Sequence, residues 1–291
     1  MKSRIIGRID LDDNKLKDDL QTVAGNQHHA NESVYSEYVF GSWKNFVLRN
    51  PTGNHDDAVF QGVNKSALPT SLGKQCRYLH SVIESEFCTE RLMMARVNLM
   101  RNGMLIPHRD YVEFKKSGED LIRLHVPLQM NPESLHSEDD QVFHMRKGEV
   151  WILAVDKVHA ASNPTDFLRM SLVLDFHLAG DPVSVLFANP DNYQPDMEPA
   201  LIARQPLESG FMDGITSLKN LINHANYNDL LMLLSRVHFY KEVDASTCYD
   251  WLIDMCKEKE DSTLLERSLR LKKYMIEERE FEERLYASTA N

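Results

Sequence analysis

LRMSLVLDFHL (residues 168–178) is an almost unbroken apolar run that ends at the turn sequence AGDP. A run of this kind, bounded by Gly, Pro and Asp, predicts a buried β-strand. No amphipathic helix of about 10–15 residues fits between this run and similar ones before it, so the spacing predicts a sandwich or barrel rather than alternating β–α units. The earlier runs are RLMMARVNLM (91–100), LIRLHVPLQM (121–130) and GEVWILAV (148–155).

Two further segments before residue 205 carry weaker patterns. DDNKLKDDLQTVA (12–24) predicts a helix that leads into the strands. MNPESLHSEDDQ (130–141) is too polar for a strand by composition, so we expect an exposed loop there.

The pattern becomes helical after the turn QPLESG (205–210). Apolar residues recur at helical spacing over the following segments, and the last of them opens with an Asp-Ser cap signal at residue 261. The sequence therefore predicts a jelly-roll (double-stranded β-helix) domain over residues 1–205 and a helical domain over residues 206–291. The final stretch, 261–287, is charge-rich and predicts a long helix.

Composition and charge restrict the class of protein. The formal net charge is −11, and no run of basic residues is present, which argues against nucleic-acid binding. No apolar stretch approaches the roughly 20 residues that a membrane span needs, and the acidic start lacks the features of a signal peptide. The four cysteines form no CxxC pair, so we expect reduced thiols. We expect a cytoplasmic protein.

The segment LIPHRDYVEF (105–114) contains the candidate metal ligands His108 and Asp110. Residues two apart on an extended chain point to the same face, so an imidazole and a carboxylate can reach one ion. His159, in a loop just past the strand 148–157, is the candidate third ligand. Two histidines and one carboxylate leave three positions open on Fe(II), which suits a bidentate 2-oxo acid and O2.

Arginines in the strands point to an anionic co-substrate. Arg169 lies ten residues past His159 among apolar residues, where a cation is costly without a partner. It would suit the distal carboxylate of 2-oxoglutarate. The alternative is a structural ion pair with Asp175 or Asp156. A zinc hydrolase would use the same three ligands but would leave Arg169 unexplained. Another strand places Arg123 and His125 on one face.

The sequence resembles the bacterial free L-proline hydroxylases, which are related to the aspartyl/asparaginyl β-hydroxylases. The resemblance rests on four segments around the candidate site, and it extends to the N-terminal and helical parts of the chain. The four segments are IPHRDYVEF (106–114), IRLHVPL (122–128), FHMRKGEVWILAVDKVHAA (143–161) and LRMSLVLDF (168–176). It continues in GRIDLDDNKLKDDL (7–20), SWKNFVLRNPTG (42–53), LLSRVHFYKE (233–242) and YDWLIDMCK (249–257).

The resemblance implies a jelly-roll enzyme that couples decarboxylation of 2-oxoglutarate to hydroxylation, with O2 as oxidant. His108, Asp110 and His159 match the iron ligands, and Arg169 matches the arginine that binds 2-oxoglutarate. Arg123 and His125 match an Arg-x-His pair that lies near the co-substrate or the substrate carboxylate, and both roles stay open.

The expected substrate is a small free amino acid, with Arg96 a candidate partner for its carboxylate and Trp43 a candidate wall against its ring. The resemblance favours L-proline and, slightly, cis-4 over cis-3 hydroxylation. L-pipecolate, L-lysine and a peptide side chain are the alternative substrates, and a cupin-like binding module is the non-enzymatic alternative. The amphipathic C-terminal helices leave a homodimer open.

Overall fold

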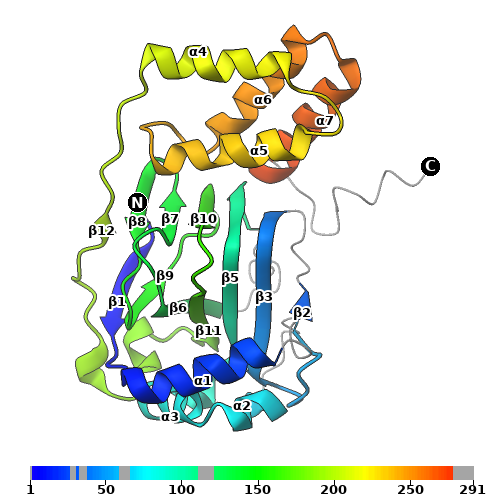
Figure 1. Ribbon diagram of the computed structural model, residues 1–291. Coiled ribbons are helices and arrows are strands. Elements are labelled where there is room, and N and C mark those ends of the chain that lie inside the picture. Colours follow the sequence, from blue (N-terminus) through cyan, green and yellow to red (C-terminus); the bar gives the residue numbers. More distant parts are fainter. Residues whose placement is uncertain (1, 27–30, 33–37, 59–65, 111–120, 278–291) are drawn as a thin grey trace.

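The computed structural model describes residues 2–26, 31–32, 38–58, 66–110 and 121–277 (Figure 1). Its strands are β1 (Arg4–Arg8), β2 (Asn31–Glu32), β3 (Val39–Asn50), β4 (Leu68–Pro69), β5 (Leu92–His108), β6 (Leu121–Gln129), β7 (Leu135–Glu138), β8 (Gln141–His144), β9 (Glu149–Ile152), β10 (His159–Asn163), β11 (Arg169–His177) and β12 (Ala200–Leu201).

The α-helices are α1 (Asp13–Gly25), α2 (Ser71–Gln75), α3 (Arg77–Glu86), α4 (Ser209–Ser217), α5 (Tyr227–Arg236), α6 (Thr247–Glu258) and α7 (Ser262–Lys272). Single turns of 3₁₀-helix are η3 (Thr89–Arg91), η5 (Val183–Leu186), η6 (Pro190–Asn192), η7 (Leu218–Asn220) and η8 (Val237–Phe239), and η9 (Lys273–Glu277) is a π-helical turn.

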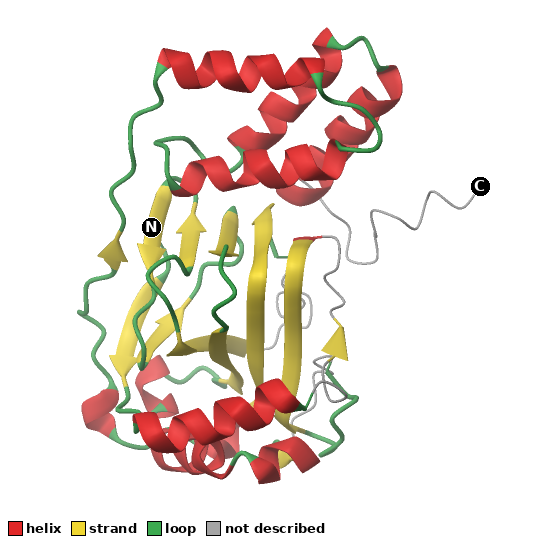
Figure 2. Ribbon diagram, viewed as in Figure 1, coloured by secondary structure: helices red, strands yellow, loops and turns green. Residues whose placement is uncertain are grey.

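The strands form one curled antiparallel sheet, a half-barrel of the jelly-roll type, as the sequence predicts. Its order is β1-β9-β6-β11-β5-β10-β7-β8-β12, and β3 pairs with β5 and with the short strands β2 and β4. Along one edge, β5 pairs first with β11 and then with β10. The long strand β5 therefore joins the two halves of the sheet. Figure 2 shows the strands between two groups of helices.

Side chains alternate strictly between the two faces of the central strands. On β5, Ala95, Val97 and Leu99 belong to a buried apolar core, whereas Arg96 and Asn98 face a cavity. Strands β6 and β11 show the same alternation. Because successive side chains of a strand point to opposite faces, one set of residues builds the core and the other builds a polar cavity.

Helices α1, α2 and α3 pack against the apolar face of the sheet (Figure 1). The predicted N-terminal helix is confirmed as α1, which begins after Asp12, whose carboxylate accepts hydrogen bonds from two backbone N–H groups. Leu16 and Leu20 of α1 join the same core as Leu79 and Ile83 of α3. These helices close one side of the sheet and leave the polar face free to bind a ligand.

The expectation of an exposed loop over residues 130–141 is wrong for its second half, because residues 135–138 form the buried strand β7. The polar side chains are buried because the fold supplies partners. Glu138 accepts hydrogen bonds from the backbone N–H groups of Lys2 and Ser3, and the Ser137 hydroxyl bonds to Nε2 of His238. Composition alone cannot reveal such partners, since they come from distant parts of the chain.

The placement of His159 in a loop is also wrong, because this residue begins β10. It pairs with His108 on β5 and with Glu138 on β7, so it is held on both sides by the sheet. This candidate ligand is therefore more rigidly positioned than a loop residue would be.

The helical region follows β12 and covers one end of the half-barrel (Figure 1). Met104, Ile106 and Ala160 of the sheet share a buried core with helix residues such as Leu231 and Leu252. The Asp-Ser cap signal is confirmed: Asp261 accepts a hydrogen bond from the N–H of Leu264 at the start of α7. The long helix expected over 261–287 ends in η9 within the described residues, and 278–287 lie outside them. The domain boundary at residues 205 and 206 stays a prediction.

Two hydrogen bonds connect the helical region to the backbone on either side of His108. The Tyr249 hydroxyl on α6 donates to the carbonyl of Pro107, and the N–H of Arg109 donates to the carbonyl of Met275 at 2.9 Å. Tyr249 is fully buried, and burial raises the pKa of its hydroxyl well above the ordinary value, so it stays a donor.

None of the described helices is both long and apolar enough to cross a membrane. The four cysteines are free thiols, as expected, and Cys76, Cys248 and Cys256 are buried.

Replacing Tyr249 with Phe should lower the free energy of unfolding by about 1–3 kcal/mol, because the Pro107 carbonyl loses its donor in a buried place. Urea denaturation followed by far-ultraviolet circular dichroism would measure this. Tyr240→Phe is the matched control, since the Tyr240 side chain is 52% exposed and its loss of a hydroxyl should change little. Equal stability of the two variants would contradict the role given to Tyr249.

Candidate active site

The three predicted metal ligands meet where β5 ends and β10 begins. His108 and His159 are cross-strand neighbours in the β5–β10 pair. Asp110 follows His108 by two residues, and its N–H donates to the carbonyl of Val155 at 2.8 Å. The Asp110 carboxylate lies 3.3 Å from Nε2 of His108 and 4.0 Å from Nε2 of His159. One potential ligand atom from each residue lies within 4.8 Å of the others.

Backbone carbonyls fix the orientation of both imidazole rings. Nδ1 of His108 lies 2.6 Å from the carbonyl of Ile106, and Nδ1 of His159 lies 3.0 Å from the carbonyl of Lys157. A carbonyl can only accept, so each Nδ1 carries the hydrogen and each Nε2 presents a lone pair. Tyr38 stacks on His108 with ring centroids 4.4 Å apart and further restricts that ring. Such supporting contacts are typical of metal-bound histidines.

The ligand atoms of this cluster fit a divalent metal. Burial, reinforced by nearby His108, lowers the pKa of His159 to about 4, so this imidazole is neutral at neutral pH. The Nε2 atoms of the two imidazoles and one carboxylate oxygen face one point, and all three can act as metal ligands. Without a cation, the lone pairs would repel one another. The set is the two-histidine, one-carboxylate arrangement that suits Fe(II) with open coordination positions.

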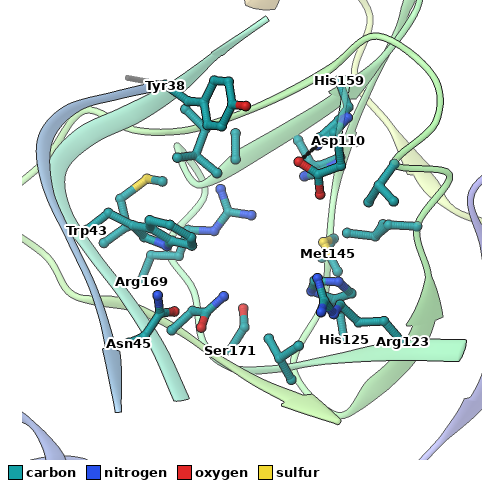
Figure 3. Close-up of a pocket in the computed structure, with 18 of the residues that line it drawn as sticks. Tyr38, Trp43, Asn45, Asp110, Arg123, His125, Met145, His159, Arg169 and Ser171 are labelled. Carbon is teal, nitrogen blue, oxygen red and sulfur yellow. Dashed lines mark ion pairs between the residues drawn. The ribbon is translucent and has the colours of Figure 1, made fainter. Parts of the chain in front are cut away.

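The cluster opens into a cavity on the polar face of the sheet (Figure 3). His159 and Asp110 lie on one side of it, and Arg169 enters from the opposite wall. Arg123 and His125 lie on the same side as the metal ligands. Its lining also includes Arg96 and Trp43, so the cavity brings together all eight of the predicted site residues.

Arg169 is buried and has no carboxylate partner among the residues that the structure describes. Its Nη1 donates to the carbonyls of Leu135 and Ser162, at 2.9 and 3.2 Å. Burial lowers its pKa to about 10, so the guanidinium remains charged at neutral pH. The alternative of an ion pair with Asp175 does not hold, because that carboxylate bonds to other arginines.

Asp175 binds both remaining arginines of the cavity. Its carboxylate lies 2.9 Å from Nη2 of Arg96 and 2.6 Å from Nε of Arg123. Burial on its own would raise the pKa of Asp175, but Arg123 and Arg96 outweigh it and lower that pKa. The carboxylate is therefore ionised and holds the two guanidinium groups side by side.

Sequence reasoning missed several residues that line the cavity: Tyr38, Asn45, Asn98, His136 and Ser171. Three of them could have been found by the two-residue repeat of a strand. Asn45, Asn98 and Ser171 each lie two positions beyond a predicted site residue, namely Trp43, Arg96 and Arg169. His136 lies in β7, where no strand was predicted, and Tyr38 precedes β3.

Both the sheet region and the helical region of the chain match models of known protein families. Residues 11–178 match the family model for aspartyl/asparaginyl β-hydroxylases, and residues 183–283 match the model for the C-terminal region of L-proline 3-hydroxylase.

Characterised relatives match over the whole length. L-proline cis-3-hydroxylase 1 from a Streptomyces species is 35% identical, over 99% of this chain and 100% of the relative. L-proline cis-4-hydroxylase from Rhizobium meliloti is 31% identical, over 96% of this chain and 98% of the relative.

Among solved structures, a 2OG-Fe(II) oxygenase family oxidoreductase from Burkholderia pseudomallei aligns with a TM-score of 0.34 at 11% identity. The alignment covers 54% of this chain and 77% of that one. At that TM-score the two structures share too little to support an inference.

The convergent triad and the family matches make the protein a 2-oxoglutarate- and Fe(II)-dependent oxygenase. Within that class, identity above 30% over almost the entire chain places it in the free L-proline hydroxylase family.

Replacing Asp175 with Asn should destabilise the protein by about 3 kcal/mol at neutral pH, because the buried guanidinium of Arg96 and the partly buried one of Arg123 lose their counter-charge. The pKa of Asp175 is lowered in the folded protein. The ionised carboxylate therefore stabilises the folded state above the ordinary carboxyl pKa of about 4, and this contribution is lost as the pH falls from there through the lowered pKa. The difference from wild type should therefore shrink in acid. Urea denaturation at several pH values measures it, and a difference independent of pH would contradict the ionised carboxylate.

Proposed function

We propose that the protein hydroxylates free L-proline, with Fe(II) bound by His108, Asp110 and His159 and with 2-oxoglutarate as co-substrate. The observation that carries the proposal is that the triad and Arg169, a buried cation bonded only to backbone carbonyls among the described residues, face one cavity. Full-length similarity to two kinds of L-proline hydroxylase supports the substrate.

Arg169 is the proposed partner of the distal carboxylate of 2-oxoglutarate. A planar guanidinium can pair with a carboxylate through two parallel hydrogen bonds, which offsets the loss of water from both ions. Its two carbonyl contacts use Nη1 and hold the side chain across the cavity from the metal ligands.

His125 is the proposed second contact of the co-substrate. Burial, and then the charge of Arg123, lowers the pKa of His125 to about 3, so the ring is neutral. Its Nε2 is buried and has no hydrogen-bond partner among the described residues. A ligand carboxylate in the cavity would offset the cost of that buried polar atom.

Arg96 and Arg123 are proposed to receive the carboxylate of the amino acid. Asp175 lies behind both and fixes them in one place, so neither guanidinium has to be ordered when substrate binds. Trp43 on β3 lies at the cavity wall (Figure 3) and is the proposed apolar surface against the ring.

Bound iron would supply the activation of O2 and the oxidation of an unactivated C–H bond, with 2-oxoglutarate as the source of two electrons. The chain's own residues bind and orient the metal, the co-substrate and the substrate. The carbonyl-bound imidazoles would present Nε2 to the metal, and Arg169 would orient the co-substrate. The Arg96–Asp175–Arg123 group would position the substrate carbon that reacts.

The regiochemistry is a narrower proposal. We propose cis-4 rather than cis-3 hydroxylation, because the segments LRNPTG (48–53) and YDWL (249–252) resemble the cis-4 enzymes slightly more. L-pipecolate, L-lysine and a peptide side chain remain the alternative substrates. Reaction of the Fe(II)-loaded enzyme with 2-oxoglutarate, O2 and each free amino acid, followed by NMR of the product, would distinguish them.

Replacing Asp110 with Ala should abolish proline-dependent formation of succinate, because the metal loses its anionic ligand. Asp166→Ala is the matched control, since that carboxylate is exposed and pairs with Arg101 away from the cavity. Succinate can be measured by chromatography. Turnover retained by the Asp110 variant would remove this residue from the metal site, and no turnover by wild type with any amino acid would overturn the proposed function.

Replacing Arg169 with Ala should raise the apparent KM for 2-oxoglutarate by about 10- to 100-fold, because hydrogen bonds to a charged carboxylate are worth roughly 1.5–3 kcal/mol. Steady-state kinetics at saturating proline would measure this. The control is Arg101→Ala, which removes an exposed arginine from β5. An unchanged KM for 2-oxoglutarate would contradict the assignment.

A further inference from the structure

Three polar residues form a band across neighbouring strands of the cavity wall. Asn98 on β5 pairs with Asn45 on β3 and with Ser171 on β11, and all three line the cavity. Figure 3 shows Asn45 and Ser171 along one wall, between Arg169 on one side and His125 on the other. The proposed function gives this band no role.

The amide oxygen of Asn98 is the notable atom of the band. Oδ1 is buried and makes no hydrogen bond with any residue that the structure describes. A buried acceptor without a partner is unfavourable, so a position of this kind in a cavity wall indicates a group that a ligand satisfies. The ligand must bring a donor to it.

The charges of the cavity restrict what that donor is. Among the described lining residues the carboxylate is that of Asp110, a proposed metal ligand, and Asp175 behind the wall is already shared by Arg96 and Arg123. An amino acid can place its carboxylate against the arginines, but its ammonium group is repelled by the same cations. An uncharged acceptor away from the guanidinium groups is what the ammonium needs.

We infer that Oδ1 of Asn98 accepts a hydrogen bond from the ammonium group of the amino-acid substrate. The inference rests on the proposed function and deepens it. Asn98 lies two residues from Arg96 on one face of β5, and such neighbours are about 7 Å apart. One small α-amino acid can bridge that distance, with its carboxylate at Arg96 and its ammonium at Asn98. Ser171 and Asn45 flank the contact as further polar groups.

This contact would make Asn98 a determinant of specificity. A secondary ammonium, as in proline, has two N–H donors and satisfies the amide oxygen. A ring of the same shape with oxygen in place of nitrogen brings no donor, so it leaves Oδ1 unsatisfied. A site built on a hydrogen bond rejects such an analogue far more strongly than an apolar pocket rejects a change of size.

The test uses the full-length enzyme with Fe(II) and 2-oxoglutarate, and two variants of Asn98. Asn98→Leu removes the acceptor at similar volume and should raise the KM for L-proline by about 10- to 100-fold. Asn98→Asp keeps an acceptor and should stay within about fivefold of wild type, given that hydrogen-bond contributions vary by context. Both variants should keep the wild-type KM for 2-oxoglutarate.

An analogue gives a second readout that a general disturbance would not produce. Oxolane-2-carboxylate, which has a ring oxygen in place of the nitrogen, should inhibit wild type much more weakly than proline binds. In Asn98→Leu this preference should fall to about threefold or less, because neither ligand then finds the acceptor. Calorimetric titration of proline into the loaded enzyme without O2 would check the affinities. Asn228→Leu, an exposed amide on α5, is the control.

Three results would overturn the inference. Asn98→Leu could leave the KM for proline unchanged, it could raise the KM for 2-oxoglutarate instead, or it could keep the full preference for proline over the analogue. Each of these outcomes requires that wild type turns over proline. Absence of turnover by wild type would instead count against the proposed function, so the two failures are distinguishable.

Discussion

The pairing of β10 with the end of β5 is the constraint on which the site depends. It makes His108 and His159 direct cross-strand neighbours, and carbonyls two residues earlier in each segment then turn both Nε2 atoms to one point. Since β5 also pairs with β11, the same strand carries Arg96 and Asn98 past Arg169. A slip of one residue would reverse every side chain of β5, moving the cavity residues into the core. The proposed positions of metal, co-substrate and substrate thus depend on one register.

The three arginines of the cavity have two kinds of partner. Arg96 and Arg123 share the carboxylate of Asp175, which compensates their burial before any ligand arrives. Arg169 has only backbone carbonyls as partners among the described residues, so much of its charge remains to be compensated. A dianionic co-substrate would therefore gain most at Arg169, the contact proposed for it, whereas the paired arginines would offer a weaker, well-oriented anion site. This division favours an ordered arrangement of two carboxylate ligands in one cavity.

The sequence was sufficient for features that rest on local rules. Alternation along strands placed Arg123 with His125 and separated Arg169 from its apolar neighbours, and the His-x-Asp spacing predicted the pair His108 and Asp110 that the fold brings together with His159. The sequence was insufficient where the hydrogen-bond partners of a segment come from distant parts of the chain. Strand β7 is buried because Lys2 and Ser3 bind Glu138, and no window around residue 138 contains that information. The alignment of Asn98 with Asn45 and Ser171 on one cavity wall likewise appears only when three strands lie side by side.

The bonds from Tyr249 and Met275 to the backbone beside His108 have a thermodynamic consequence. If docking of the helices sharpens the position of a metal ligand, occupancy of the metal must stabilise the docked helices by the same free energy, because such coupling is reciprocal. Iron loading and the integrity of the C-terminal region are then linked quantities. Loss of the metal would then weaken the docking of the helices at one end of the half-barrel, and resistance of this region to proteases would report metal status.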